Sequence, residues 1–303
     1  MFVSTGAELI DACGKENKSI WEYTIREEME KSELSREAVI EKMRKNLNVM
    51  LSSSRLAQEK EVRSVSGLIG GDAYKLRKYA QTGNTLTGSF MVSAMASALS
   101  SSEVNAAMGR IVACPTAGSC GILPATVISA AEMLGKSEED MINALFTASG
   151  VGIIIAKNTT LAGAEGGCQA ECGSAAAMGS AAVVEMMGGT PAQALHAAAM
   201  VLKNIIGLVC DPVAGLVEVP CAKRNFAGTV SALTTADVAM AGVESKIPFD
   251  EVVWAMSRVG RQLPPELRET AQGGIAVTPT GLKLKKEIFG QQPEYGGECE
   301  KEK

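Results

Sequence analysis

The amino-acid sequence predicts an all-α protein, a single large helical domain whose loops converge on one site. Strand signals are nearly absent: the runs 151–155 and 215–219 could be strands, but no alternation of strands with helices emerges. Only 4% of the residues are aromatic, so the core must be built from Ala, Val, Leu, Ile and Met. The 15 Met and 31 Gly indicate closely packed helices with irregular gaps and many turns.

The first 63 residues form a charged helical segment that we expect to pack on the core. Apolar residues recur at helical spacing in its second half, namely Val39, Ile40, Met43, Leu47 and Met50. This pattern is typical of an amphipathic helix with one solvated face. A Gly-rich connector follows over residues 64–86, and the small residues of 91–101 predict a further helix.

Capping signals mark the helices of the second half. Ser137 with Asp140 has the form of a capping box. Thr190, Pro191 and Gln193 combine a cap residue, Pro at the first helical position and Gln at the third. Further helices are expected over 227–243, 248–260 and 264–270. We therefore divide the chain into the N-terminal segment 1–63, a central helical domain 64–282 and a mobile C-terminal tail 283–303.

Composition excludes several classes of protein. A formal charge of −5 and the absence of interleaved basic and aromatic residues argue against a nucleic-acid surface. The smoothest apolar run, 174–184, is closed by Glu185 and predicts a buried helix rather than a membrane span. The N-terminus lacks the features of a signal peptide, so we expect a cytoplasmic protein. In that compartment, the eight Cys are expected to be thiols or metal ligands rather than disulfides.

Three cysteines in Gly- and Pro-rich loop sequence are candidate metal ligands: Cys168, Cys210 and Cys221. The intervals of 42 and 11 residues differ from the compact Cys-x-x-Cys spacing of ferredoxins and zinc ribbons. Three loop thiols on a helical scaffold could hold one inorganic cluster with one coordination position free. The alternative is that they are structural or incidental thiols, as we expect for Cys13 and Cys172.

A second candidate site is the loop CPTAGSCGILPA, which begins at residue 114 and runs into a helix at about Pro124. Free amides at a helix start, together with the Thr116 and Ser119 hydroxyls, can hold a carboxylate. The alternative is an ordinary capped loop. The only His, His196, lies among apolar neighbours and is either structural or a proton carrier. Lys157, at the entrance to the Cys168 loop, could orient an anion.

Three long segments carry a resemblance to a known family: CPTAGSCGILPA, GAEGGCQAECGSA and GLVCDPVAGLVEVPCAKRN. They resemble the signature segments of the iron–sulfur-dependent L-serine dehydratases, and in particular the α subunit of the two-subunit form. The likeness runs from about residue 20 to residue 282. It implies a mainly α-helical domain, which agrees with the fold expected from the residues themselves.

The resemblance implies an oxygen-sensitive [4Fe–4S] cluster held by Cys168, Cys210 and Cys221, with Cys299 near the C-terminus as a candidate fourth ligand. It implies a lyase in which an open iron acts as Lewis acid for the β-hydroxyl of L-serine, giving pyruvate and ammonia for gluconeogenesis. The loop residues expected to bind the substrate carboxylate are Thr116, Gly118, Ser119 and Gly121. The residues expected to support the cluster loops are Glu165, Gln169 and Asp211. The general base stays unassigned, with His196 and Lys157 as candidates.

One departure from the family concerns its partner. Single-chain relatives carry a Ser-Ser-His-Thr motif in an extra domain, and this sequence has no such motif. That fits an α subunit that needs a separate β subunit and has little activity alone. Three alternatives stay open: a pyridoxal-phosphate dehydratase, a non-catalytic metal-stabilised interaction module, and a dehydratase of L-threonine or a related hydroxy acid. The first would need an α/β fold, and one substrate methyl discriminates by only about 1–3 kcal/mol.

Overall fold

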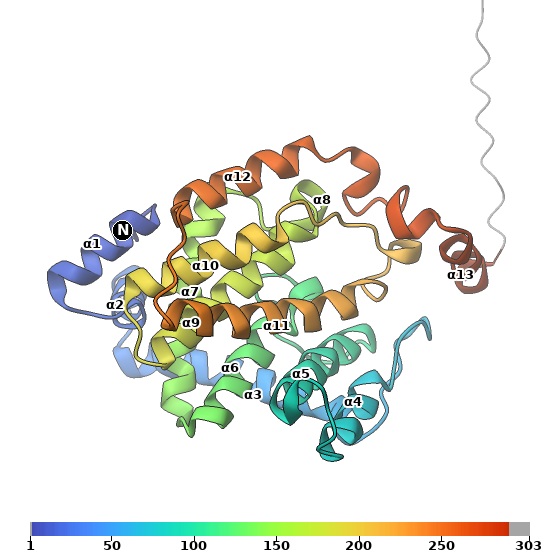
Figure 1. Ribbon diagram of the computed structural model, residues 1–303, viewed down its shortest axis with the longest axis horizontal. Coiled ribbons are helices and arrows are strands. Elements are labelled where there is room, and N and C mark those ends of the chain that lie inside the picture. The colour runs from blue at the N-terminus through green and yellow to red at the C-terminus, as the bar shows by residue number, and fades with distance from the viewer. Residues whose placement is uncertain (1, 291–303) are drawn as a thin grey trace, which may run out of the picture.

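A computed structural model describes residues 2–290, and within that range the protein consists of thirteen α-helices without a strand (Figure 1). The predicted all-α fold is confirmed. The longer helices are α1 (Gly6–Glu16), α2 (Ile20–Ser32), α3 (Arg36–Glu59), α4 (Asp72–Gln81), α5 (Gly88–Ala106), α6 (Ile122–Leu134), α7 (Glu138–Asn158), α9 (Ser174–Met186), α10 (Pro191–Ile205), α11 (Cys221–Met240), α12 (Phe249–Gln262) and α13 (Pro279–Phe289). The four-residue α8 (Gly163–Gly166) lies between α7 and α9.

Helix α9 forms the centre of the molecule. It packs against α6, α7, α10 and α11, and all of its residues except Glu185 are buried (Figure 1). A helix that is apolar on every side belongs in a core, as expected for the run 174–184. Small residues permit the close packing: a Cβ on Gly179 would lie 3.1 Å from Thr126 of α6.

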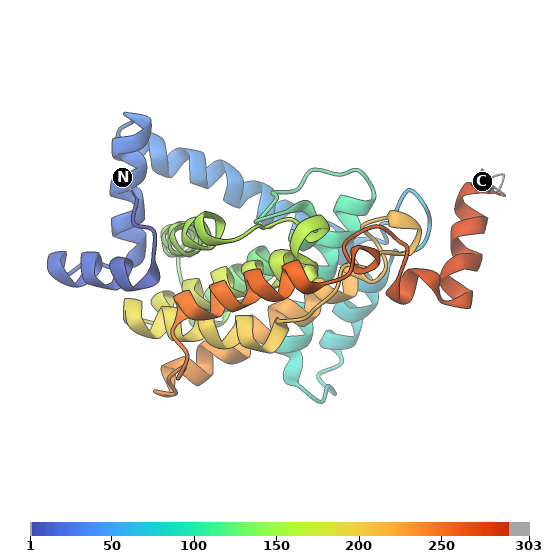
Figure 2. The same cartoon turned by 90° about the horizontal axis from the view of Figure 1, so that it is seen from above.

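The N-terminal helices lie at the opposite end of the molecule from α13 (Figure 2). Glu185, the one residue of α9 that is not fully buried, joins them to the core. Its carboxylate accepts hydrogen bonds from the Ile20 amide at 2.7 Å and from the Thr147 hydroxyl at 2.5 Å. A carboxylate at the start of α2 is also stabilised by the positive end of that helix's dipole. The charged segment 1–63 is thus anchored by one acidic group of the central helix.

The predicted capping boxes are confirmed at Ser137 and Asp140, which begin α7, and at Thr190 and Gln193, which begin α10. Other boundaries differ. Helix α11 begins at Cys221, six residues earlier than expected, and 264–270 forms only a 3₁₀ turn at Pro265–Leu267. The run 151–155 lies inside α7 rather than in a strand.

Two stretches are long and apolar enough to cross a membrane, Ala117–Leu134 and Glu138–Asn158. The protein buries 72% of the first and 61% of the second, as the core helices of a soluble protein do. The expected tail begins within α13 and continues beyond residue 290, outside the described range. The division into 1–63, 64–282 and 283–303 stays a prediction.

A buried carboxylate also caps α4. Glu103 of α5 is 1% exposed, and its Oε1 accepts from the amides of Asp72 at 2.7 Å and Ala73 at 3.3 Å. Its Oε2 has no partner within residues 2–290. Burial raises the pKa of Glu103 to about 6, against a lowering by the two amides.

This pKa predicts that the contribution of Glu103 to stability falls as pH rises. A carboxyl whose pKa is raised on folding makes its full contribution to the stability of the folded protein below its unfolded pKa. This contribution is lost as the pH rises through the pKa of the folded state. Since the pKa rises from 4.5 to about 6, the loss is about 2 kcal/mol. Glu103→Gln can still accept from both amides and should lack this loss. Urea unfolding from about pH 4 to about pH 8 measures it, and equal pH dependence in both proteins would contradict the assignment.

Candidate metal centre

Three loops meet at the start of α11, near α8 (Figure 1). The Sγ atoms of Cys168 and Cys210 and a carboxylate oxygen of Glu171 all lie within 4.8 Å of one another. Cys168 and Glu171 are brought together by a π-helical turn, Gln169–Gly173, that leads into α9. Such turns are rare and occur mostly at functional sites. Two of the three predicted ligands are thus adjacent, together with a carboxylate that the sequence did not single out.

Cys221 is the first residue of α11 and is 8% exposed. It lies outside the group whose ligand atoms fall within 4.8 Å. Burial, followed by the charge of nearby Cys168, raises the pKa of its thiol to about 12. Cys172, which the sequence led us to regard as structural, shares a hydrogen bond with Cys168. The centre is therefore a cluster of four buried thiols, those of Cys168, Cys172, Cys210 and Cys221. The first and third of these lie closest together, and Glu171 lies beside them.

Arg224, one turn into α11, was missed by the sequence analysis. Its guanidinium donates to Cys168 Sγ at 3.2 Å, to the Val209 carbonyl at 2.8 Å and to Asp211 Oδ1 at 2.7 Å. Hydrogen bonds from Cys172 and Cys210, with the charge of Arg224, hold the pKa of Cys168 well below its usual range. Thiolate is the form that ligates a metal, so Cys168 is prepared for binding. The AKRN segment directly after Cys221 was the available signal.

Two of the predicted supporting residues hold the loops. Asp211 is 2% exposed and accepts from Arg224 and from the Ile275 amide at 2.8 Å. Gly274 has a φ of +59°, and a Cβ there would lie 2.3 Å from the Asp211 carboxylate. Gln169, fully buried, accepts from the Gly207 amide at 2.9 Å and donates to two carbonyls, joining both cysteine loops. The third, Glu165, is exposed and lines a different pocket, beside Lys157.

The predicted substrate loop lies against the thiols. Asn225 of α11 fixes it: its Oδ1 accepts from the Gly121 amide at 2.8 Å and its Nδ2 donates to the Gly118 carbonyl at 2.8 Å. The Thr116 and Ser119 hydroxyls lie 3.2 Å apart. The Gly121 amide is therefore bonded to Asn225, whereas Thr116 and Gly118 lie toward Glu171 and the buried Ser119 hydroxyl contacts Thr116. Asn225 was also missed, because its role depends on where α11 begins.

Glu171 joins the loop to the thiols. Its carboxylate would lie 3.3 Å from a Cβ on Gly118 and 2.8 Å from one on Gly163, and it hydrogen-bonds with the Thr116 hydroxyl. A Cβ on Gly163 would also lie 3.1 Å from Cys210 Sγ. Burial, then the charge of Cys168, raises the pKa of Glu171 to about 7. Gly118 and Gly163 thus lie beside the Glu171 carboxyl, whose pKa is raised to about 7.

The two candidate bases lie elsewhere. His196 accepts from the Ser245 amide at its Nδ1, 3.3 Å away. It lies nine residues before the end of α10, or about 14 Å along the helix from the end that leads to Cys210. Lys157 donates to the Phe2 and Val3 carbonyls and so fastens the N-terminus. Within the described chain neither side chain contacts the thiols, and Cys299 lies outside the described residues.

The residues fit a thiolate-bound metal. Soft sulfur ligands select zinc, copper(I) or iron–sulfur clusters, and four buried thiols with a donor from Arg224 supply the charge and hydrogen bonding that such groups need. The lack of a Cβ at Gly118 and Gly163 lets the backbone of their loops lie close to Glu171 and, at Gly163, to Cys210. A cysteine-rich centre that can hold a metal is therefore present beside the loop predicted to bind the substrate.

The family described as "Serine dehydratase alpha chain" matches residues 15–276. The "Probable L-serine dehydratase, alpha chain" of Bacillus subtilis (strain 168) is 50% identical over 283 residues, 93% of this chain and 94% of the relative. The "L-serine dehydratase, alpha chain" of Peptoniphilus asaccharolyticus is 46% identical over 287 residues, 95% and 98% of the two chains. "L-serine dehydratase 1" of Escherichia coli (strain K12) is 38% identical over 182 residues, 59% of this chain but 40% of the relative. The resemblance drawn from three loop motifs is thus confirmed, and the chain belongs to the serine dehydratase alpha chain family.

Proposed function

We propose that this chain is the alpha subunit of an L-serine dehydratase, a lyase that converts L-serine to pyruvate and ammonia. The observation that carries the proposal is the meeting of the cysteine centre and the Thr116–Ser119 loop at Glu171, in a chain whose relatives over nearly its full length are named for this reaction. L-threonine differs by one methyl group, so serine is proposed from the relatives' names and not from pocket shape.

The proposed cofactor is a [4Fe–4S] cluster held by Cys168, Cys210 and Cys221, with one iron left without a protein ligand. When bound, such an iron supplies a Lewis acid for the β-hydroxyl of the substrate. The chain itself binds the substrate carboxylate at Thr116, Gly118 and Ser119. Arg224 keeps Cys168 in its thiolate form, and Asn225 keeps the loop at its position beside the thiols.

Glu171 is proposed to take the α-proton of the substrate. Its carboxyl oxygen lies within 4.8 Å of the Cys168 and Cys210 Sγ atoms and hydrogen-bonds with the Thr116 hydroxyl, so a substrate held by the loop would lie against it. Burial raises the pKa of this carboxyl above its usual range, so that the group holds a transferred proton better. His196 and Lys157 make other contacts and are set aside for this role.

A separate β subunit is proposed as partner, in the cytoplasm, where the pyruvate would serve gluconeogenesis. The relatives that match over their whole length are named alpha chains, whereas the matching part of the Escherichia coli relative is 40% of that protein. The remainder of such longer relatives would be supplied here by the second chain.

Anaerobic reconstitution with iron and sulfide tests the proposal. We expect the broad absorbance of an iron–sulfur cluster and, after one-electron reduction with dithionite, an electron paramagnetic resonance spectrum that L-serine perturbs. Pyruvate should form at an appreciable rate only after the β subunit is added. Protein that takes up redox-inactive zinc and no iron would overturn the dehydratase, and full turnover by the chain alone would overturn the need for a partner.

A further inference from the structure

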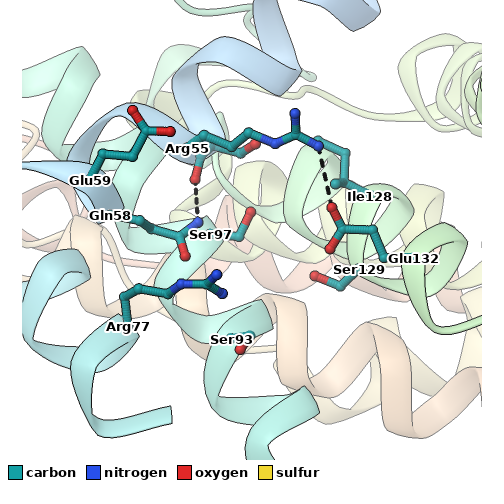
Figure 3. A pocket seen from close by; sticks show the side chains of 10 residues that line it. Arg55, Gln58, Glu59, Arg77, Ser93, Ser97, Ile128, Ser129 and Glu132 are labelled. Carbon is teal, nitrogen blue, oxygen red and sulfur yellow. Dashed lines mark hydrogen bonds and ion pairs between the residues drawn. The ribbon is translucent and has the colours of Figure 1, made fainter. Parts of the chain in front are cut away.

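A polar pocket lies outside the metal centre, where α3, α4, α5 and α6 come together (Figure 3). Its volume is about 200 Å³. Ten residues line it, among them Arg55, Gln58, Arg77, Ser97, Ser129 and Glu132. The pocket shares no residue with the thiol centre or its substrate loop. Pockets for drug-sized ligands have volumes of about 300–1,000 Å³, so this one fits only a smaller molecule.

Ser97 points to a missing ligand. It is 5% exposed, lines the pocket, and its hydroxyl has no hydrogen-bond partner among residues 2–290. Other buried serines of α5 are satisfied: Ser100 donates to the Ser53 carbonyl at 2.7 Å and Ser102 to the Ala98 carbonyl at 3.2 Å. A buried hydroxyl without a partner costs about 1–3 kcal/mol, which a bound polar group would offset.

The pocket is lined by two arginines and two glutamates, so its charges are equal in number, but not all of them form ion pairs. Arg55 and Glu132 form an ion pair of 3.3 Å across the opening, and both side chains are more than half exposed. Such a pair is weak and can open for a ligand. Arg77 makes no hydrogen bond or ion pair in the part of the chain that the structure describes, and its guanidinium points toward Ser93 and Ser97 (Figure 3).

We propose that this pocket binds a small α-amino acid as its zwitterion. The carboxylate is held by Arg77 and the Ser97 hydroxyl, and the ammonium group by Glu132. A simple oxyanion is less well matched, because it would face the carboxylates of Glu59 and Glu132 that also line the pocket. The ligand would satisfy the unpartnered hydroxyl and the unpaired guanidinium together, and its own two charges would match those of the pocket.

The pocket lies close to the substrate loop but is distinct from it. Ala98, the residue after Ser97, has its carbonyl 2.3 Å from where a Cβ on Gly121 would be. Helix α5 thus carries the pocket at Ser97 and supports the loop at the next residue. The site is a second amino-acid site, beyond the proposed dehydration, and its binding does not depend on a cluster.

Calorimetric titration of the full chain with glycine tests the proposal, because glycine has both charges and no side chain. We expect binding that Arg77→Met weakens roughly tenfold or more, since a charge-assisted hydrogen bond is lost. Ser97→Ala should weaken it by a smaller factor. Lys78→Met is the matched control: it removes a neighbouring positive charge of α4 that lies over the Tyr74 ring and does not line the pocket.

Several outcomes would overturn the proposal. Glycine binding that is equal in wild type, Arg77→Met and Ser97→Ala would belong to another site, such as the substrate loop. Acetate binding as tightly as glycine would mean an oxyanion site without recognition of the ammonium group. An absence of heat with glycine at two well-separated temperatures would mean that the pocket does not bind it, and would overturn the proposal. Both variants replace single side chains on helix faces, and circular dichroism checks that they fold.

Discussion

Replacing Cys210 by Ala is expected to abolish iron binding and L-serine dehydration. Cys210 is 2% exposed and forms the tightest thiol pair of the centre with Cys168. Mutation of a residue that merely supports a metal ligand lowers metal affinity or activity roughly 10–100-fold. Loss of a ligand itself should therefore lower them by more than about 100-fold. Iron content after anaerobic reconstitution and pyruvate formation with the β subunit present measure the two effects.

Cys13→Ala is the matched control for this loss. Cys13 is a buried thiol of α1, and burial raises its pKa to about 12, so it behaves as a small apolar side chain. This variant should bind iron and turn over like the wild type, at a small cost in stability. If Cys210→Ala retained full iron and activity, Cys210 would not be a ligand and the centre would have to be built on other thiols.

Arg224→Met is expected to lower the free energy of unfolding by about 3–5 kcal/mol, because removing one partner of a buried ion pair leaves an uncompensated charge. The side chains of Arg224 and Asp211 are 13% and 3% exposed. Methionine also loses the bonds to the Val209 carbonyl and to Cys168. Urea unfolding of the metal-free protein under reducing conditions gives the value.

The neighbouring Lys223→Met separates this effect from a general loss of positive charge. Lys223 pairs with Asp72 at the surface, its side chain is 50% exposed, and such pairs contribute about 0–1 kcal/mol. Adding Asp211→Asn to Arg224→Met should restore part of the lost stability, because the unpaired carboxylate is removed. Equal destabilisation by Lys223→Met and Arg224→Met would contradict the buried-pair explanation.

The fold followed from the sequence because its signals are local. Ser137 with Asp140 and Thr190 with Gln193 lie three residues apart, and a capping box needs only that spacing. The apolar run 174–184 predicted a core helix for the same kind of reason, since a helix without a polar face has no side to present to water.

The details of the centre did not follow, because they depend on contacts between distant segments. Glu171 lies near Cys210, 39 residues on, only once the loops have folded together. Arg224 and Asn225 gained their roles because α11 begins at Cys221 and not at residue 227. His196 drew notice as the only His, yet its environment, the amide of Ser245, was invisible in the sequence.

The first turn of α11 makes the length of this segment critical for engineering. Cys221, Arg224 and Asn225 face three different partners from one helical turn: the thiols, Asp211 and the loop at Gly118. One inserted residue between them would rotate everything before it by about 100° relative to everything after it. Point changes here alter one contact at a time, whereas a single insertion or deletion would misalign the metal side and the substrate side together. Libraries that vary chain length should therefore leave 221–225 intact.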